Sequence, residues 1–319
     1  MPSLSADPRT KLISAIDLAS CRVELSGKPL VLLCGGPAKI KERPDDPDPP
    51  VASLRDAITR ANTSYEVFRP EEITSWHADG VYKNLVSFEA DLASVCSLVV
   101  IVLESVGALA ELGAFSQQDE LRKKLIVILP SEFQNDPSFV NLGLLRHIAE
   151  SNDTSVKAYP WDIKSPTSIS DEIVADVIDD IDQELRKLGK TEVLRLSETS
   201  HVMVLICNLI GLFAALKESE LLAYLSQLGV SILKEDLRRK LFLLEEFKLV
   251  RRERYSDSVF YMRGKESHHG LRLGVTAFGK GPGYQDSLRI QMECIEYYNN
   301  NAVHKHRVRA LAQAGRTSR

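Results

Sequence analysis

Residues 98–129 read LVVIVLESVGALAELGAFSQQDELRKKLIVIL, and this stretch decides the fold of the first half of the chain. Two apolar runs, Leu98–Leu103 and Leu125–Leu129, enclose an acidic, glycine-containing turn and a helical pattern. Two β-rich runs joined by a helix are typical of a βαβ unit with parallel strands. Ligands of open α/β sheets bind at the carboxyl ends of the strands, so residues 104–111 are predicted to border a small-molecule site.

Strand and helix patterns alternate around this unit, which predicts a Rossmann-like doubly wound parallel sheet over residues 1–165. Residues 166–195 form an acidic helical pattern that we interpret as a linker. Residues 196–319 begin with a run of helices, which is followed by RRERYSDSVFYMRG at 251–264, typical of a hairpin. The order helix, helix, helix, hairpin predicts an α-rich winged helix-turn-helix domain.

Charge is distributed unevenly along the 319 residues, whose formal net charge is −4. Residues 251–319 hold 13 Lys and Arg against 6 Asp and Glu, whereas residues 1–250 hold 27 against 38. A basic final segment is typical of contact with phosphate or with an acidic partner, and equally of a solvated basic tail.

The five cysteines are scattered, without a CxxC pair or a His/Cys spacing that would hold a metal. We therefore expect no metal site, and a reducing cytoplasm as the compartment. The first residues lack the basic and apolar regions of a signal peptide. The longest apolar stretch, Val202–Leu216, is interrupted by Asn208 and Gly211, so no membrane span is predicted.

Gly35 and Gly36 follow an apolar strand pattern directly. Two glycines there let the backbone approach a ligand and offer N–H groups to an anion, although a plain tight turn explains them equally well. The chain lacks a GxGxxG fingerprint at this turn, which disfavours hydride transfer.

Glu111 is the main catalytic candidate, because a carboxylate early in a helix is kept ionised by the helix dipole. Gly113 is expected to let that helix lie close to the sheet. A fixed carboxylate suits stabilisation of an oxocarbenium-like sugar during cleavage of a glycosidic bond. A plain helix N-terminal charge is the alternative. Glu104 and Glu89 are interpreted either as ligands of ribose hydroxyls or as surface acids.

Five motifs occur in order along the chain: LLCGG at 32–36, FE at 88–89, ESVGALAELGAF at 104–115, LRKKL at 121–125 and FVNLG at 139–143. In this combination the chain resembles the effector protein of bacterial retrons. That family joins a nucleoside deoxyribosyltransferase-like domain to a winged-helix DNA-binding domain. The similarity is tightest from Ile101 to Ile128. Val106 and Ala110 depart from the family pattern, which has a proline and a hydroxyl residue there.

The resemblance implies a toxin-like enzyme that cleaves an N-glycosidic bond, with NAD as its substrate and no cofactor. Glu111 would be the catalytic carboxylate. The nucleotide pocket would be lined by Gly35, Gly36, Glu89, Glu104, Ser105 and Gly107. The implied partners are the retron reverse transcriptase and its multicopy single-stranded DNA, which hold the effector inactive until phage infection. A homo-oligomer or filament is also compatible with the family.

Six cations of the second half are candidates for contact with nucleic-acid phosphates. They are Arg238, Arg239, Lys240, Arg251, Arg252 and Arg254. Acidic residues on the same helix pattern, such as Glu235 and Glu246, leave protein contact as an alternative role. A nucleotide-sensing winged-helix transcription regulator without turnover, or a scaffold that only docks onto the reverse transcriptase, therefore remain as competing functions.

Overall fold

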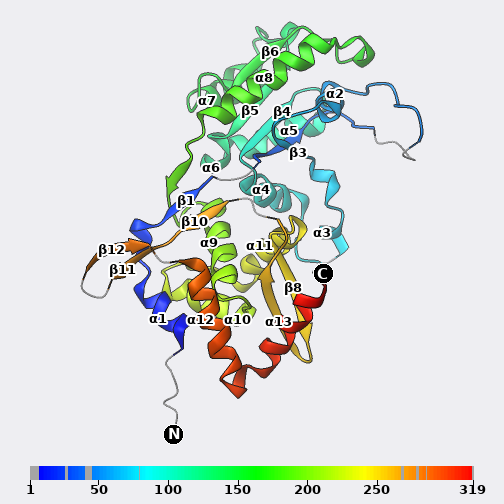
Figure 1. Cartoon of the computed structure of the whole chain (residues 1–319). Coiled ribbons are helices and arrows are strands. Elements are labelled where there is room, and N and C mark those ends of the chain that lie inside the picture. Colours follow the sequence, from blue (N-terminus) through cyan, green and yellow to red (C-terminus); the bar gives the residue numbers. More distant parts are fainter. Residues whose placement is uncertain are drawn as a thin grey trace. The chain divides into compact units, whose positions relative to one another are not determined.

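The computed structural model describes residues 7–25, 28–39, 45–78, 80–266, 269–277, 280–284 and 286–317. The chain forms two compact units (Figure 1). One unit comprises Lys28–Leu188. The other combines Met1–Gly27 with Gly189–Arg319.

The unit 28–188 is built on a five-stranded parallel sheet with the order β3-β2-β4-β5-β6. Its strands are β2 (Leu30–Cys34), β3 (Glu66–Phe68), β4 (Leu98–Val102), β5 (Leu125–Pro130) and β6 (Val156–Tyr159). The predicted βαβ unit is confirmed, with α5 (Val106–Ser116) joining β4 to β5. The direction of strand addition reverses between β2 and β4, and such a reversal opens a crevice at the carboxyl ends of the two strands.

Helices cover both faces of this sheet, because its central strands are apolar at every position and must be buried on both sides. Helices α2 (Leu54–Arg60) and α8 (Asp171–Lys187) share a core with one face. Side chains that alternate to the other face meet α4 (Leu85–Val95) and α5. The α/β fold with a parallel sheet is therefore as expected from the sequence.

Shorter helical elements complete this unit. They are η2 (Pro70–Glu72), α3 (Ser75–Ala78), α6 (Asp119–Arg122), η3 (Ser131–Phe133), the π-helical turn η4 (Val140–Leu145), α7 (Arg146–Ala149) and η5 (Pro166–Ser168).

The boundaries of the units differ from those expected. Helix α8 was assigned to a linker, but Val177 and Ile181 of this helix are fully buried in the core of the sheet domain. Most of its acidic residues lie on the opposite, more exposed side, which gave the segment an acidic appearance in the sequence, although Glu184 is buried. The sheet domain therefore extends to Leu188.

The other unit contains the predicted helix, helix, helix, hairpin order. The helices are α9 (Thr199–Leu212), α10 (Glu218–Gln227) and α11 (Lys234–Glu246), and the antiparallel hairpin is β8 (Val250–Tyr255) with β9 (Ser258–Arg263). Leu216 and Tyr261 exchange two backbone hydrogen bonds of 3.0 and 2.7 Å, which joins the segment after α9 to the hairpin. On α11, Leu237, Leu241 and Leu244 form the predicted apolar face and are buried.

The segment expected to be a basic tail is folded into α12 (Ser287–Asn299), η6 (Ala302–His304) and α13 (Lys305–Thr317). Ala310 and Ala314 of α13 pack against Phe260 and Met262 of the hairpin. Small residues on one face allow this close packing, while the basic residues of the helix gave the segment its net charge.

Residues 7–25 belong to this second unit rather than to the sheet domain in which they were expected. They form α1 (Pro8–Ala15), η1 (Leu18–Ser20) and β1 (Arg22–Glu24), and β1 pairs with β7 (Thr191–Val193) and β10 (Gly270–Arg272). The remaining hairpin is β11 (Gly274–Ala277) with β12 (Lys280–Tyr284).

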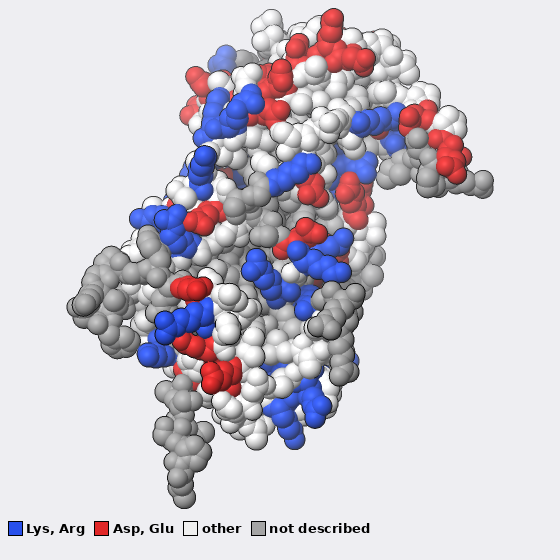
Figure 2. Space-filling view, viewed as in Figure 1, with Lys and Arg blue, Asp and Glu red and all other residues white. Residues whose placement is uncertain are grey.

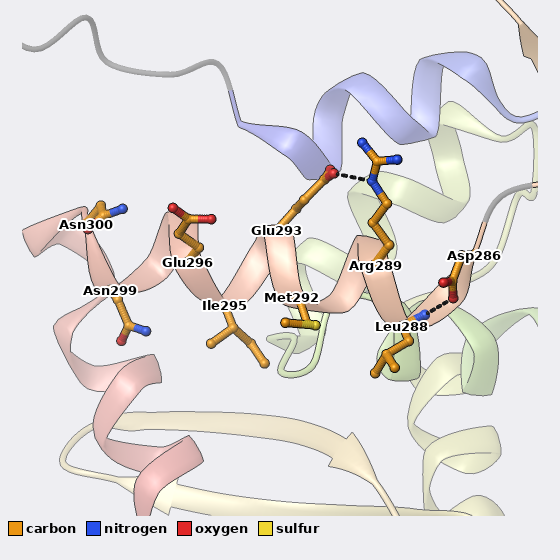
Figure 3. Close-up of a pocket in the computed structure, with 9 residues that line it drawn as sticks. All are labelled: Asp286, Leu288, Arg289, Met292, Glu293, Ile295, Glu296, Asn299 and Asn300. Atoms are coloured by element: carbon orange, nitrogen blue, oxygen red, sulfur yellow. Dashed lines mark hydrogen bonds and ion pairs between the residues drawn. The ribbon is translucent and has the colours of Figure 1, made fainter.

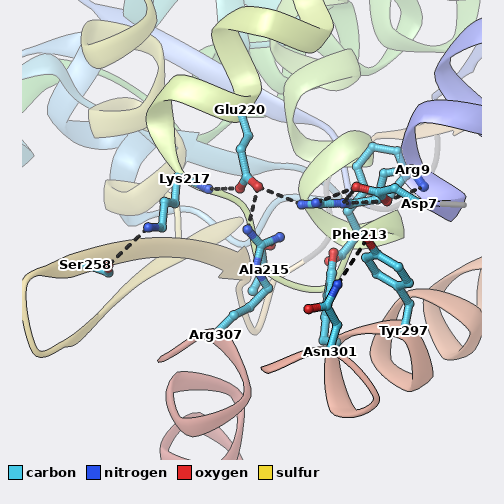
Figure 4. A network of polar contacts seen from close by, with 11 residues as sticks. Asp7, Arg9, Phe213, Ala215, Lys217, Glu220, Ser258, Tyr297, Asn301 and Arg307 are labelled. Atoms are coloured by element: carbon cyan, nitrogen blue, oxygen red, sulfur yellow. Dashed lines mark hydrogen bonds and ion pairs between the residues drawn. The ribbon is translucent and has the colours of Figure 1, made fainter. Parts of the chain in front are cut away.

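A buried network of charged residues connects Arg9 of α1 and Arg307 of α13 to α10 (Figure 4). Glu220 accepts Nη1 of Arg9 at 2.7 Å and Nη2 of Arg307 at 2.5 Å. Arg307 also donates to the carbonyl of Ala215 at 2.9 Å. Because the two guanidinium groups are almost fully buried, this shared carboxylate is what makes their burial tolerable.

Among the described residues, the structure has no helix long and apolar enough to cross a membrane.

The packing of α8 generates a first prediction. Ile181→Ala should lower the free energy of unfolding by about 2–4 kcal/mol, because it leaves a cavity in a fully buried core. The exposed Asp179 on the same helix provides the control, and Asp179→Ala should change stability by no more than about 0.5 kcal/mol. Urea unfolding measures both variants, and equal, small effects would show that α8 is the linker expected from the sequence.

A buried acid cluster at the carboxyl edge of the sheet

The reversal between β2 and β4 brings together five polar side chains from separate parts of the chain. They are Cys34 at the end of β2, Arg55 on α2, Glu71 on η2, Glu89 on α4 and Glu111 on α5. Glu111 and Glu89 were expected to share a pocket, and each contributes to the electrostatic environment of Cys34.

Glu104 holds this edge together through backbone hydrogen bonds. Its Oε1 accepts the N–H groups of Gly36 and Arg55, each at 3.0 Å, and its Oε2 accepts that of Leu54 at 2.9 Å. Two of these donors lie at the N-terminus of α2, which lacks intrahelical partners for its first N–H groups. We therefore assign Glu104 to positioning, in place of the expected contact with ribose hydroxyls.

Gly35 and Gly36 are required by close packing. A Cβ on Gly35 would lie 2.9 Å from Cβ of Arg55, and one on Gly36 would lie 2.8 Å from Cβ of Ser53. The expectation that this pair offers N–H groups to an anion is not met at Gly36, whose N–H is donated to Glu104. The glycines thus bring the loop after β2 against α2.

Ser105 caps α5, since its Oγ accepts the N–H of Ala108 at 3.1 Å and donates to the carbonyl of Gly35 at 2.9 Å. Gly107 lies in the exposed first turn of the same helix. The expected role of Gly113 in close packing is wrong, because a Cβ there would meet nothing within 4 Å.

Arg55 is a functional residue that the sequence reasoning missed. Its buried guanidinium donates Nε to the carbonyl of Leu33 at 2.9 Å and Nη1 to that of Gly36 at 3.0 Å. Nη2 pairs with Glu71 at 2.6 Å. Burial opposes ionisation of Glu71, but the hydrogen bond and charge of Arg55 outweigh it and lower the pKa of Glu71. Each nitrogen of the Arg55 guanidinium thus donates at least one hydrogen bond to a protein group.

Glu111 presents a carboxyl group that is short of partners. Its Oε2 is buried and accepts no hydrogen bond within the described part of the chain. Burial raises the pKa of Glu111, while the neighbouring Cys34 thiol and the charge of Arg55 act in the opposite direction. The sequence predicted an ionised form secured by the helix dipole. Because Glu111 is the sixth residue of α5, the dipole is weak there and burial dominates.

Glu89 is almost completely buried, and burial together with the charges of Glu111 and Glu71 raises its pKa to about 7. Near neutral pH this carboxyl group therefore exchanges its proton readily. A protonated Glu89 reduces the repulsion that an anionic Glu111 would meet. Two neighbouring carboxyl groups of this kind can divide the roles of anion and proton carrier.

Exposed apolar side chains lie on the same edge of the sheet as the cluster. In the described part of 28–188, every large apolar residue that is exposed lies at the start of α4 or after β4 or β5. These residues are Leu85, Val86, Val106, Leu109, Phe133, Phe139 and Leu142. The extremes are Val106, 87% exposed, and Phe139, 78% exposed. Apolar side chains on the same edge as buried polar groups are typical of a small-molecule site, and these seven residues are called the apolar rim.

Several of the cations that were predicted to contact nucleic acid form ion pairs within the protein. Arg238 pairs with Glu218 at 2.9 Å, Arg239 with Asp236 at 2.5 Å and Arg252 with Glu245 at 3.4 Å. Arg238 and Arg252 are nevertheless exposed, and exposed pairs of this kind exchange partners at little cost.

Arg251 points to a different neighbour, donating to the carbonyl of Ala314 at 3.2 Å. This contact satisfies a carbonyl in the last turn of α13, so we assign Arg251 to packing instead of phosphate contact. Arg254, two residues further along the strand, is exposed, and Lys240 is half-buried. Basic and acidic side chains are interspersed over the face shown in Figure 2.

One group of potential metal ligands lies in the described residues: Glu192, Glu198 and His201. Nδ1 of His201 accepts the backbone N–H of Arg195 at 3.0 Å. Nε2 must then carry the proton, and it faces Glu198 at 3.3 Å. An Nε2–H group cannot bind a metal, so this cluster is a hydrogen-bonded acid–histidine pair.

The fold places this chain in the class of α/β proteins with a five-stranded parallel sheet, and sequence comparison then gives the family. The sequence model of the STM3845 retron effector protein matches residues 51–252, which is more than half of the chain. The chain therefore belongs to this retron effector family. The matched span includes Glu71, Glu89, Glu104 and Glu111, together with the three helices and the start of the hairpin.

Two curated relatives from Escherichia coli are similar over shorter stretches. The "Retron Ec73 putative ribosyltransferase/DNA-binding protein" is 42% identical over 72 residues, which are 23% of each chain. The "Retron Ec86 putative ribosyltransferase/DNA-binding protein" is 36% identical over 92 residues, 28% of this chain and 30% of the relative. The chain thus spans less than a third of the length of these relatives in each match.

The environment of Glu89 generates a prediction for stability. Its pKa rises from 4.5 to about 7 on folding, so the folded state binds more protons between these values. Stability must therefore fall as the pH rises through this window, by an amount on the order of 2 kcal/mol. Glu89→Gln cannot titrate and should lose this part of the slope in urea unfolding at pH 5 and 7.5. The exposed Glu132, changed to Gln, should keep the wild-type slope.

Proposed function

We propose that this chain cleaves an N-glycosidic bond of NAD or a related nucleotide, acting as the toxic effector of a retron anti-phage defence system. The observation that carries the proposal is the Glu111 carboxyl group at the reversal of the sheet, whose buried Oε2 has no hydrogen-bond partner among the residues that the structure describes. Membership in the retron effector family and the ribosyltransferase names of the two relatives support it.

The acid cluster suits cleavage of a bond between a sugar carbon and a base, in which positive charge develops on the sugar carbon as the base leaves. As the C1′–N bond breaks, its electron pair goes to the base and positive charge develops on C1′. An anionic Glu111 stabilises this charge or bonds to C1′. A water molecule then adds its oxygen to C1′, displacing Glu111 where that bond has formed, and its surplus proton passes to a carboxylate of the cluster. Arg55 is already paired with Glu71, so it does not neutralise Glu111 completely.

The charge of the cluster favours NAD over a neutral nucleoside. The nicotinamide ring is a cation in NAD and becomes neutral when it leaves, so it needs no proton from the protein. Glu111 and Glu89 lie together in a buried site. Negative charge there favours a cationic ring beside the two carboxyl groups and disfavours a phosphate group in that same position. The apolar rim provides contacts for the flat faces of such a ring.

The second unit is proposed as a winged-helix domain that contacts nucleic acid. The order of its elements supports this, with α11 in the place of a recognition helix and β8–β9 in the place of the wing. Arg238, Arg252 and Arg254 are the exposed cations available for phosphates. In the proposed system the ligands are the retron reverse transcriptase and its multicopy single-stranded DNA, which keep the effector inactive.

The decisive experiment follows products chromatographically after purified protein is incubated with NAD, nucleosides or deoxynucleotides. The wild type should release nicotinamide from NAD, and Glu111→Gln should reduce the rate by at least about 100-fold, because the anion at C1′ is lost. Glu132→Gln, an exposed acid at the same edge of the sheet, should retain activity.

Other outcomes separate the competing functions. Release of a free base from nucleosides would keep the role of Glu111 and change the substrate. Tight nucleotide binding without turnover, in the presence and absence of the retron components, would instead favour the nucleotide-sensing regulator. Equal activity of the wild type and Glu111→Gln would overturn the proposed mechanism.

Cys34 is predicted to set the pH range of this activity. Its thiol contributes to lowering the pKa of Glu111, so Cys34→Ala should raise that pKa and move the acidic limb of the kcat/KM profile to higher pH. Cys34→Ser retains a donor and should keep the limb at or below its wild-type position. A loss of rate in both variants without movement of the limb would show that Cys34 only fills space.

A further inference from the structure

Helix α12 carries an apolar stripe that the fold of its own unit leaves open to solvent (Figure 3). The inward side of the helix is formed by Ile290, Cys294 and Tyr298, all of which are buried. On the outward side, Leu288 and Met292 are each 62% exposed. With Ile295 and Asn299, these two residues line an open groove along the helix.

We propose that this stripe is an interface between two copies of the chain, in which α12 packs antiparallel against α12 of the second copy. The residues Leu288, Met292, Ile295 and Asn299 are spaced four, three and four positions apart. This is the alternating spacing of the seam of a coiled coil, which keeps successive side chains on one line facing a partner helix. Asn299 is exposed and lies at the end of the stripe, so the apolar part of the seam is Leu288, Met292 and Ile295.

The stripe is complementary to itself only in the antiparallel direction. When Met292 of one helix faces Ile295 of the other, Leu288 comes to face Asn299, and two-fold symmetry repeats both contacts. Leu288, at one end of the stripe, thereby meets the residue at the other end of the partner's stripe, and the two inner residues meet each other. This is the self-complementarity that an isologous interface requires.

The charges beside the stripe match the same arrangement. Arg289 and Glu296 are seven positions apart and flank the seam on the same side, as their helical spacing requires. In an antiparallel pair, Arg289 of each copy lies next to Glu296 of the other. Arg289 now pairs with Glu293 at 3.0 Å, but both side chains are exposed, so the exchange of partners costs little. A parallel pair would not bring these opposite charges together.

The seam is short, because α12 has 13 residues. Val303, 84% exposed just beyond the helix, adds apolar surface near its end. An interface of this size is smaller than those of permanent dimers, so we expect association in the micromolar range. The inference is independent of the chemistry proposed for Glu111, since it rests on a different unit of the chain.

Sedimentation velocity of the full chain over a wide micromolar range tests the proposal. The wild type should shift from monomer to dimer with increasing concentration. Met292→Glu should remain monomeric throughout, because it places a carboxylate in the seam. Leu233→Glu changes a leucine outside α12 that is 72% exposed, and this variant should dimerise like the wild type. Circular dichroism confirms that each variant is folded.

Charge exchange tests the direction of packing. Arg289→Glu and Glu296→Arg should each weaken dimerisation by about tenfold, because each creates two like-charge contacts across the symmetry axis. The double variant restores both pairs and should recover most of the affinity. A monomeric wild type, or a dimer that survives Met292→Glu, would overturn the interface. A double variant weaker than both single variants would overturn the antiparallel arrangement.

Discussion

The three backbone hydrogen bonds to Glu104 are the constraint on which the functional edge depends. Glu104 follows β4, whereas its donors lie in the loop after β2 and at the start of α2. The carboxylate of Glu104 therefore connects the segments on the two sides of the reversal, the one after β4 and the one between β2 and α2. Without it, three N–H groups of a partly buried segment would lose their partner, at a cost of about 1–3 kcal/mol for each group left unsatisfied.

Arg55 extends this constraint from the backbone to the acid cluster. Its N–H is donated to Glu104, and its guanidinium holds the carbonyl groups of Leu33 and Gly36. The side chain is consequently fixed in a position where it pairs with Glu71. The buried cation of this edge thus serves structure, and Glu111 and Glu89 are left with burial as the main influence on their pKa values.

The sequence could predict the elements that depend on local periodicity, and it failed where long-range contact decides. The apolar runs of β4 and β5 and the order of the three helices and hairpin were visible in the sequence. The roles of Glu104 and Arg55 depend on β2 lying beside β4, and Glu104 bonds to a residue 68 positions away. In α8, the acidic surface concealed the regular spacing of Val177 and Ile181, which a search for helical periodicity would have found.

The burial of Glu111 limits the ligands that the site accepts. Within the described residues, Oε2 of Glu111 is buried without a hydrogen-bond partner, and a positively charged ligand would offset the cost of keeping this group ionised. The apolar rim requires the same ligand to be flat or apolar in part. Under the proposed function, a ring that is cationic before bond cleavage and neutral afterwards would satisfy both requirements, and its loss of charge on cleavage would weaken its electrostatic attraction to Glu111. Product release is then favoured by the same electrostatics that favour substrate binding.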